Sequence, residues 1–429
     1  MTGKSSNPVF RKTGIFERAM LISNAHAPFN IVSVLRLENA PLPSAVKGAL
    51  EKLQQRQPFL RARIVNGGFE ALPSLGFPFT TIERTSPNQW REIAEQEMAF
   101  RYDHATGPLF HAIYIYFDGY GDLVLNVHHA IMDAASGTNL LDELLRLCAG
   151  EVTDLPALEP APALEEHFPP LYQGLWRVFS LGGYALAQMS DLLRFLWRTR
   201  GKRTPPVRLG GRGHIATLIL PENLVDSLSR QGRKDGVTLN SLLNAALVLA
   251  TNRHLYGGQA VPMQTFVFAD LRPYTEPPTG PEPLANYISM MRFTVDVSGD
   301  KDFLELARNL HTKIYRALKQ GDKFNASLMS EPLMKMFIAM KSMRMGSTAL
   351  NYSGLVPLKA QYGDIEVVGL HGFVSGYDLG PEVASQARLF NDQVWWDFIY
   401  LDTDMGAELA RTIISEVKAI LESASQSPV

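Results

Sequence analysis

Strand-like segments followed by amphipathic helices occur in both halves of the chain, and this order restricts the fold more than any other feature. The β-branched run IVSVLRLEN, from Ile31, is followed after Pro43 by apolar residues at helical spacing. The run HIATLIL, from His214, is also followed by a helical pattern. The sequence therefore predicts a mixed α/β fold with a weak internal repeat.

The length of the chain favours two lobes. Its 429 residues exceed what one hydrophobic core usually serves, and a binding site is expected between the lobes. Composition changes at a Pro-rich segment beginning near Glu151 and returns after a basic, Pro-containing segment ending near Arg208. We expect an N-terminal lobe over residues 1–150, a connector over 151–208 and a C-terminal lobe over 209–429.

The middle of the connector, LYQGLWRVFSLGGYALAQMSDLLRFLWRTR, is apolar but is interrupted by Arg177, Gln188, Asp191 and Arg194. It predicts one or two amphipathic helices and no transmembrane segment. The favoured interpretation is a packed helix that bridges the lobes, because apolar helical faces are more often core than contact surface. The alternative is a wall for an apolar substrate or a peripheral membrane contact, with the basic end from Arg198 facing anionic lipid.

Charge and cysteine content narrow the class of protein. The 41 Lys and Arg nearly balance the 43 Asp and Glu, so no nucleic-acid partner is expected. The N-terminus has no uninterrupted apolar leader. The single cysteine, Cys148, excludes an internal disulfide and lies in an apolar run, which favours an inert buried thiol in a reducing compartment. We expect a cytoplasmic protein.

Two histidines stand at the end of a predicted hairpin. The segments LFHAIYIYF and DLVLNVHH are strand-like, and the short GYG connection favours an antiparallel pair. The following AASG predicts a turn, and TNLLDELLRLC predicts a helix capped by Ser136 or Thr138. His128, His129 and Asp133 therefore lie where a strand ends and the backbone turns, a place where reactive groups are often presented.

These side chains fit a metal site or proton transfer. Neighbouring strand residues point to opposite faces, so His128 and His129 cannot easily bind one ion, and we expect no metal. A neutral histidine can take a proton from a hydroxyl or an amine, so one of the pair could be a general base and the other internal. The alternative is two ordinary half-buried histidines. No GxSxG elbow and no GxxxxGK[ST] phosphate loop competes as a catalytic signature.

Several segments resemble one family. HHAIMDA resembles the HHxxxDG signature of condensation domains and polyketide-associated, CoA-dependent acyltransferases. RQPFLRARI and GVTLNSLLNAALVLA are similar to further segments of that family, and ADLRP, LANYISM and LNYSGLVPL resemble its segments in the same order. The resemblance covers nearly the full chain and is weakest in the connector. The sequence departs from the signature at Ala134, where the family has glycine.

The resemblance implies two chloramphenicol-acetyltransferase-like lobes in one chain, which form a pseudo-dimer with an active-site tunnel between them. It implies that His129 is the catalytic base and that His128 is structural. Asp133 and Arg272 would form a structural ion pair that holds the loop.

The resemblance also implies oxyanion or substrate contacts near the base. The candidates are Asn286, Asn351 and Ser353, the last two in an NYSG loop, and the backbone near Ala134. If position 134 needs a positive φ, or if the donor chain passes against its backbone, alanine would strain or narrow the site.

The activity implied is acyl transfer from a CoA or phosphopantetheinyl carrier thioester to an apolar alcohol or amine, in lipid or natural-product biosynthesis. No tightly bound cofactor and no acyl-enzyme intermediate are expected. The rival hypothesis is a catalytically silent condensation-like module that recruits a carrier protein or partner enzyme. Ala134 favours the rival, whereas the set of His129, Asp133 and Arg272 argues against it.

Overall fold

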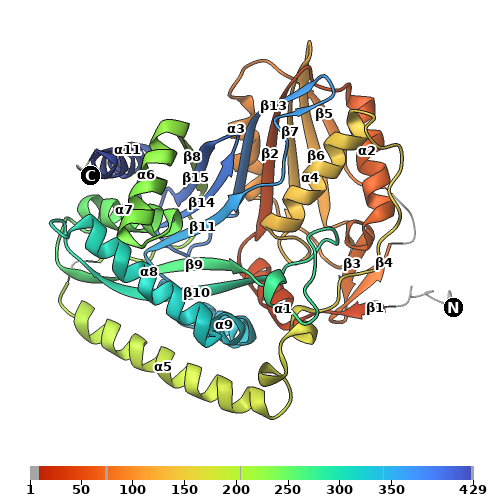
Figure 1. Cartoon of the computed structure of the whole chain (residues 1–429). Helices are drawn as coiled ribbons and strands as arrows, with labels where there is room; N and C mark the ends of the chain where they lie inside the picture. Colours follow the sequence, from red (N-terminus) through yellow and green to blue (C-terminus); the bar gives the residue numbers. More distant parts are fainter. Residues whose placement is uncertain (1–8, 73–75, 203, 342, 427–429) are drawn as a thin grey trace. The chain divides into compact units, whose positions relative to one another are not determined.

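The computed structural model forms two compact units, which are described separately here (Figure 1). It describes residues 9–72, 76–202, 204–341 and 343–426. Unit 1 contains the described residues of Met1–Phe168, Arg272–Tyr287 and Val356–Ser375. Unit 2 contains the described residues of Pro169–Leu271, Ile288–Leu355 and Gly376–Val429.

These units divide the chain differently from the lobes expected over 1–150 and 209–429. Arg272–Tyr287 and Val356–Ser375 follow the connector in sequence but belong to unit 1. The physical reason is hydrogen bonding over long sequence distances. Strand β13 (Ile365–Val374) pairs antiparallel with β2 (Asn30–Glu38), a pairing that composition does not reveal.

Unit 1 is built on a six-stranded sheet and a smaller three-stranded sheet. In the larger sheet only the pair of β5 with β6 is parallel. The order of its strands is β12 (Gln361–Tyr362), β13, β2, β7 (Tyr120–His128), β6 (Phe110–Phe117) and β5 (Phe79–Glu83). The smaller sheet has the order β1 (Val9–Lys12), β4 (Gly68–Ala71) and β3 (Ala62–Val65).

The predicted hairpin is confirmed as β6 and β7, which pair antiparallel. Asp118 and Gly119 join them with φ of 46° and 78°, the left-handed conformation that tight hairpin turns require. The hairpin carries the chain to His128, the last residue of β7. The described part of unit 1 has four α-helices, with α3 packed against β2 and β7 and α2 packed against α4. They are α1 (Ile15–His26), α2 (Pro43–Arg56), α3 (Gln89–Met98) and α4 (Ala134–Cys148).

Unit 2 contains a second six-stranded sheet, which is mixed because β11 pairs parallel with both of its neighbours. Its strands, in order across the sheet, are β10 (Ile288–Val297), β9 (Val261–Asp270), β11 (Thr348–Leu355), β14 (Val383–Phe390), β15 (Gln393–Leu401) and β8 (Gly213–Leu220). Its helices are α5 (Trp176–Thr199), α6 (Glu222–Asp235), α7 (Leu239–Leu255), α8 (Phe303–Gln320), α9 (Asp322–Leu328), α10 (Ser330–Ala339) and α11 (Ala407–Ser425).

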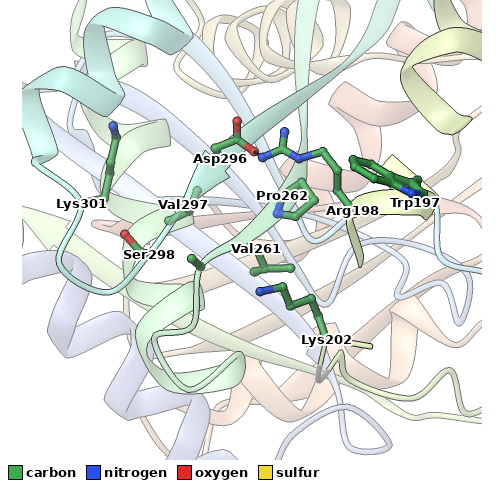
Figure 2. A pocket seen from close by; sticks show the side chains of 10 residues that line it. Trp197, Arg198, Lys202, Val261, Pro262, Asp296, Val297, Ser298 and Lys301 are labelled. Carbon is green, nitrogen blue, oxygen red and sulfur yellow. Dashed lines mark ion pairs between the residues drawn. The ribbon is translucent and has the colours of Figure 1, made fainter. Parts of the chain in front are cut away.

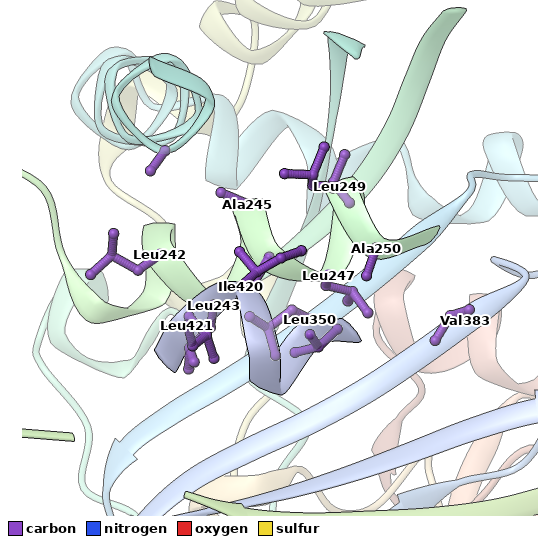
Figure 3. Packing of buried hydrophobic residues seen from close by; sticks show 14 of the residues in the cluster. Leu242, Leu243, Ala245, Leu247, Leu249, Ala250, Leu350, Val383, Ile420 and Leu421 are labelled. Atoms are coloured by element: carbon purple, nitrogen blue, oxygen red, sulfur yellow. The ribbon is translucent and has the colours of Figure 1, made fainter. Parts of the chain in front are cut away.

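Helix α7 is the centre of the core of unit 2, as its apolar composition predicts. The Thr238 hydroxyl caps the helix by accepting a hydrogen bond from the Ser241 N–H. Every residue from Ser241 to Asn252 is buried. Figure 3 shows leucines and alanines of α7 beside Ile420 and Leu421 of α11, with Leu350 and Val383 coming from the sheet.

The expectation of an amphipathic helix in the connector is confirmed, whereas its role as a bridge between the lobes stays a prediction. The connector forms one long helix, α5, in which Leu192 is the only buried residue. The side of α5 that meets the rest of unit 2 combines apolar residues, Leu192 and Tyr184, with polar ones. The Asp191 carboxylate, for example, accepts a hydrogen bond of 2.7 Å from Thr294. Among the described residues, no helix is long and apolar enough to cross a membrane.

Candidate functional site

The candidate site lies in unit 1, where β7 ends and α4 begins. After His128 the chain makes a tight turn in which the Ile131 N–H donates to the His128 carbonyl over 3.1 Å. Helix α4 then begins at Ala134, with Asp133 as its N-cap. The expected caps, Ser136 and Thr138, are therefore wrong. Asp133 is the better cap because its carboxylate accepts the Ser136 N–H over 3.0 Å, satisfying a donor that the first helical turn leaves unpaired.

His128 is a fully buried, neutral side chain. Its Nδ1 accepts the Ala130 N–H over 3.0 Å, so the ring hydrogen is on Nε2. That Nε2 has no partner among the described residues. Burial, with smaller effects of His129 and His104, lowers the pKa of His128 to about 3. These contacts fit the structural role that the resemblance implies.

His129 is held in one tautomer. Its Nδ1 lies 3.1 Å from the carbonyl oxygen of Met132. A carbonyl oxygen can only accept, so Nδ1 carries the hydrogen and Nε2 keeps its lone pair. No described residue hydrogen-bonds to Nε2. The described polar atoms that are both shielded from solvent and without a hydrogen-bond partner do not include Nε2, so this nitrogen keeps some exposure. The imidazole is therefore fixed with its basic nitrogen open.

The surroundings of His129 favour the neutral ring. The side chain is 6% exposed, and the Phe29 ring stacks on the imidazole at a centroid distance of 5.4 Å. Burial lowers the pKa of His129, against the smaller raising effects of the Met132 carbonyl and the Asp133 carboxylate. At neutral pH the ring can therefore accept a proton at Nε2.

Asp133 and Arg272 form a buried ion pair, with 2.7 Å between Arg272 Nη1 and Asp133 Oδ2. Both side chains are nearly inaccessible. Burial raises the pKa of the Asp133 carboxyl, but the Arg272 charge and the hydrogen bonds outweigh it and hold that pKa below its usual range. The pair joins the turn after β7 to the segment Arg272–Tyr287, which the chain reaches much later.

Further hydrogen bonds complete the anchoring of the turn. Asp133 Oδ2 also accepts the Tyr287 N–H over 2.8 Å. The Ser136 hydroxyl contacts Asp133 Oδ1 and the Ala285 carbonyl, each at 3.0 Å. No described hydrogen bond links the Asp133 carboxylate to the His129 ring. These contacts fit a structural role for Asp133 in holding the loop, rather than a proton relay from the imidazole.

Asn286 lies beside the base. Its Nδ2 donates to the His129 carbonyl over 2.6 Å and is 3.2 Å from His129 Nδ1, while its Oδ1 is buried without a partner among the described residues. This placement fits a residue that positions the imidazole rather than one that contacts an oxyanion. The sequence resemblance indicated Asn286 as a site residue, but it did not indicate that Asn286 contacts the His129 carbonyl.

Ala134 adopts an ordinary helical conformation as the first residue of α4 and is not among the residues with positive φ. The backbone strain considered for alanine at this position is therefore absent.

Asn351 and Ser353 lie in unit 2, on strand β11. The expected NYSG loop is wrong. Asn351 is paired in register with Gln386, and the strand becomes irregular between Tyr352 and Leu355, near Gly354 with a φ of 68°. The turn-forming residues mark this irregularity within a strand. Contact of Asn351 or Ser353 with an oxyanion stays a prediction.

Three features of the site were not predicted from the sequence. They are the stacking of Phe29, the Met132 carbonyl and the Tyr287 N–H. A local signal did exist for Ser136, because a serine three residues after an aspartate N-cap can close a reciprocal capping arrangement.

Cys148, at the end of α4, has its thiol pKa raised by burial to about 12. This fits the expected inert thiol. Among the described residues, no three His, Cys, Asp or Glu side chains gather as a metal site would require.

Comparison with known proteins finds similarity to one family over the C-terminal part of the chain. Residues 210–388 match the family described as the C-terminus of phthiocerol/phthiodiolone dimycocerosyl transferase. Over 210 residues the chain is 24% identical to the phthiocerol/phthiodiolone dimycocerosyl transferase of Mycobacterium leprae (strain TN), covering 48% of this chain and 49% of that protein. The chain thus matches about half the length of its first curated relatives.

Solved structures share the fold over nearly the whole chain. Polyketide synthase associated protein 5 from Mycobacterium tuberculosis has a TM-score of 0.70 at 18% identity, with 97% of this chain and 98% of that chain covered. Trichothecene 15-O-acetyltransferase from Fusarium sporotrichioides has a TM-score of 0.76 at 12% identity, with 96% and 95% covered. The chain therefore has the two-lobed, chloramphenicol-acetyltransferase-like fold, and its similarities support a condensation-type acyltransferase superfamily.

Proposed function

We propose that this protein is an acyltransferase that uses His129 as a general base. The donor is an acyl thioester of CoA or of a phosphopantetheinyl carrier protein, and the acceptor is an apolar alcohol or amine. The similarity to a dimycocerosyl transferase and to an O-acetyltransferase supports a function in lipid or natural-product biosynthesis. The observation that carries the proposal is the Nδ1 contact to Met132, which leaves Nε2 of His129 basic and open.

The proposed reaction follows from that geometry. Nε2 takes the proton of the acceptor hydroxyl or amine while the acceptor atom attacks the thioester carbonyl carbon. The tetrahedral oxyanion then collapses, the carbon–sulfur bond breaks, and the proton held on Nε2 passes to the departing thiolate. The ester or amide and a free thiol are the products, and His129 returns to its neutral form without an acyl-enzyme intermediate.

The test compares wild type with His129→Ala and with His26→Ala, a control outside the site. Each protein is given the same acyl chains on CoA and on a carrier protein, with a panel of alcohols and amines, and products are read by mass spectrometry. We expect His129→Ala to lose at least about 100-fold in turnover, as is typical for loss of a general base, while the protein stays folded. The His26→Ala control should match wild type.

Two results would count against the proposal. Equal turnover by wild type and His129→Ala would exclude His129 as the base. Absence of product for every donor, together with tight binding of the carrier protein, would favour the catalytically silent module. The unstrained helical conformation of Ala134 removes one observation that had favoured that rival.

A further inference from the structure

Helix α5 is held on unit 2 by a mixed face, in which polar side chains make hydrogen bonds beside the apolar contacts of Leu192 and Tyr184. The Ser180 hydroxyl donates to the Asn325 side chain over 2.9 Å. Asp191 accepts from Thr294 on β10, and Arg198 forms an ion pair of 2.6 Å with Asp296 on the same strand. These contacts hold the helix by its mixed face and leave the opposite face without a partner in unit 2.

The opposite face is apolar and strongly exposed. Its residues recur at intervals of three and four, so they occupy about a third of the helix circumference along ~30 Å. Figure 1 shows α5 along the outside of unit 2, with no helix or strand of that unit beyond it. The exposed large residues include Leu175 (82%), Phe179 (74%), Leu186 (74%), Leu193 (60%) and Trp197 (77%).

Positive charge gathers at the C-terminal end of this face. Arg194, Arg200 and Lys202 have no described carboxylate partner in an ion pair. The only acidic residue of α5, Asp191, is turned inward by its bond to Thr294. Because the whole chain has a net charge of -2, this basic end is a local feature and not a general property of the surface.

A hollow of about 570 Å³ lies at the same end of the helix. Figure 2 shows Trp197 and Arg198 of α5 on one side of it, Lys202 below them, and Arg198 directed at Asp296. Lys301, whose ammonium group is paired with Glu305, lines its far side. The hollow therefore places the Lys202 ammonium group near an exposed tryptophan, a combination that suits an anionic headgroup above an apolar layer.

We propose that unit 2 docks on an anionic lipid surface through the outer face of α5. The helix would lie in the plane of the interface, with its apolar residues in the boundary of the acyl chains and with Arg194, Arg200 and Lys202 at the phosphates. A tryptophan near each end, Trp176 and Trp197, fits the preference of this side chain for the membrane interface.

The composition of the face favours lipid over a protein partner. Protein interfaces place hydrogen-bonding groups at intervals across the buried area, about one bond per 100–200 Å². The outer residues of α5 from Leu175 to Trp197 are Leu, Val, Phe, Met, Trp, Ala and Gly over most of this length. Burial of a stripe with so few hydrogen-bonding groups is favoured in an apolar medium such as lipid acyl chains, which makes no hydrogen bonds. The proposal does not rest on the proposed acyl transfer, because no residue of the His129 site belongs to α5.

The experiment is co-sedimentation of the full chain with vesicles. One set is pure phosphatidylcholine and the other is an equal mixture of phosphatidylcholine and phosphatidylglycerol. The outer-face variant is F179Q/L186Q/L193Q, and the matched control is I219Q/Y315Q/L355Q, which changes exposed apolar residues elsewhere in unit 2. A charge variant, R194Q/R200Q/K202Q, tests the basic end.

We expect wild type and the matched control to bind the mixed vesicles more tightly than pure phosphatidylcholine, and less tightly as salt is raised. The outer-face variant should bind more than about tenfold more weakly. The charge variant should lose the preference for phosphatidylglycerol. Unfolding midpoints should be unchanged, because every substituted side chain is exposed.

Tryptophan fluorescence gives a second readout. Trp90, Trp395 and Trp396 are buried, so a blue shift on addition of vesicles reports Trp176 and Trp197. Absence of both the shift and co-sedimentation for wild type would overturn the proposal, as would equal binding by the outer-face variant. A dimer that forms without lipid and is lost in the outer-face variant would assign the face to a second copy of the chain instead.

Discussion

The ring of His129 is oriented by the carbonyl of Met132, three residues further along the chain, at 3.1 Å from Nδ1. Both groups belong to the turn between β7 and α4, so the tautomer of the base is set within a few residues of the base itself. The more distant contacts of Asp133 hold this turn in place.

The first prediction concerns the pH dependence of acyl transfer. Burial lowers the pKa of His129, so the neutral base should persist below the ordinary histidine value of 6.5. We expect kcat/KM to be level at neutral pH and to fall on the acid side with an apparent pKa under 6.5. The measurement is a pH–rate profile, with the unfolding midpoint recorded at each pH. An acid limb at or above 6.5 would contradict a desolvated base.

The second prediction concerns the buried pair of Asp133 and Arg272. Removing one partner leaves the other charge buried, so Asp133→Asn and Arg272→Met should each cost about 3–5 kcal/mol of unfolding free energy. The double variant should lose clearly less than the sum of the two losses. Denaturant unfolding of all four proteins gives the coupling energy. Additive losses would show that the charges do not stabilise each other.

The third prediction concerns acid stability and His128. Its pKa is about 3 in the folded protein against 6.5 when unfolded, so the unfolded chain binds more protons between these values. The stabilisation from neutral His128 is therefore complete above pH 6.5 and declines as the pH falls toward 3. His128→Asn, which retains an acceptor for the Ala130 N–H, should reduce the slope of unfolding free energy by up to ~1.4 kcal/mol per pH unit. The matched control is His26→Asn, and an unchanged slope in the His128 variant would refute the assignment.

The fourth prediction concerns Ala134→Gly, which restores the family's signature. Because Ala134 already has a helical backbone, glycine relieves no strain and should cost at most about 0.5–1 kcal/mol of stability. Turnover should stay within about twofold of wild type, since no change of backbone is needed. Steady-state kinetics provide the check. A large gain in turnover would mean that the alanine Cβ obstructs the donor.

Local patterns predicted the elements whose structure depends on nearby residues. The hairpin of β6 and β7 was predicted correctly because turn conformation involves only a few consecutive residues. The orientation of α5 was not predictable in this way. Its apolar stripe is visible in the sequence, but the contacts of Asp191 and Arg198 with β10 decide which side faces the protein.

In the candidate site too, the strand end that depends on nearby residues was predicted, and most contacts with distant segments were not. The strand end at His128 and the ion pair of Asp133 with Arg272 were expected, the second from the resemblance. The stacking of Phe29 and the Tyr287 N–H come from segments far along the chain, and the Met132 contact depends on a backbone atom that carries no sequence signal.

The passage of the chain back into unit 1 has a consequence for synthesis on the ribosome. When residue 168 has been made, the sheet still lacks β13 beside β2, and the Asp133 carboxylate still lacks Arg272. Arg272 becomes available only when translation reaches residue 272, and β13 only when it reaches residues 365–374. The turn that carries His129 must therefore wait while roughly a third of the chain is made before the Asp133 charge is neutralised, and the edge of β2 stays unpaired for longer still, until β13 is made.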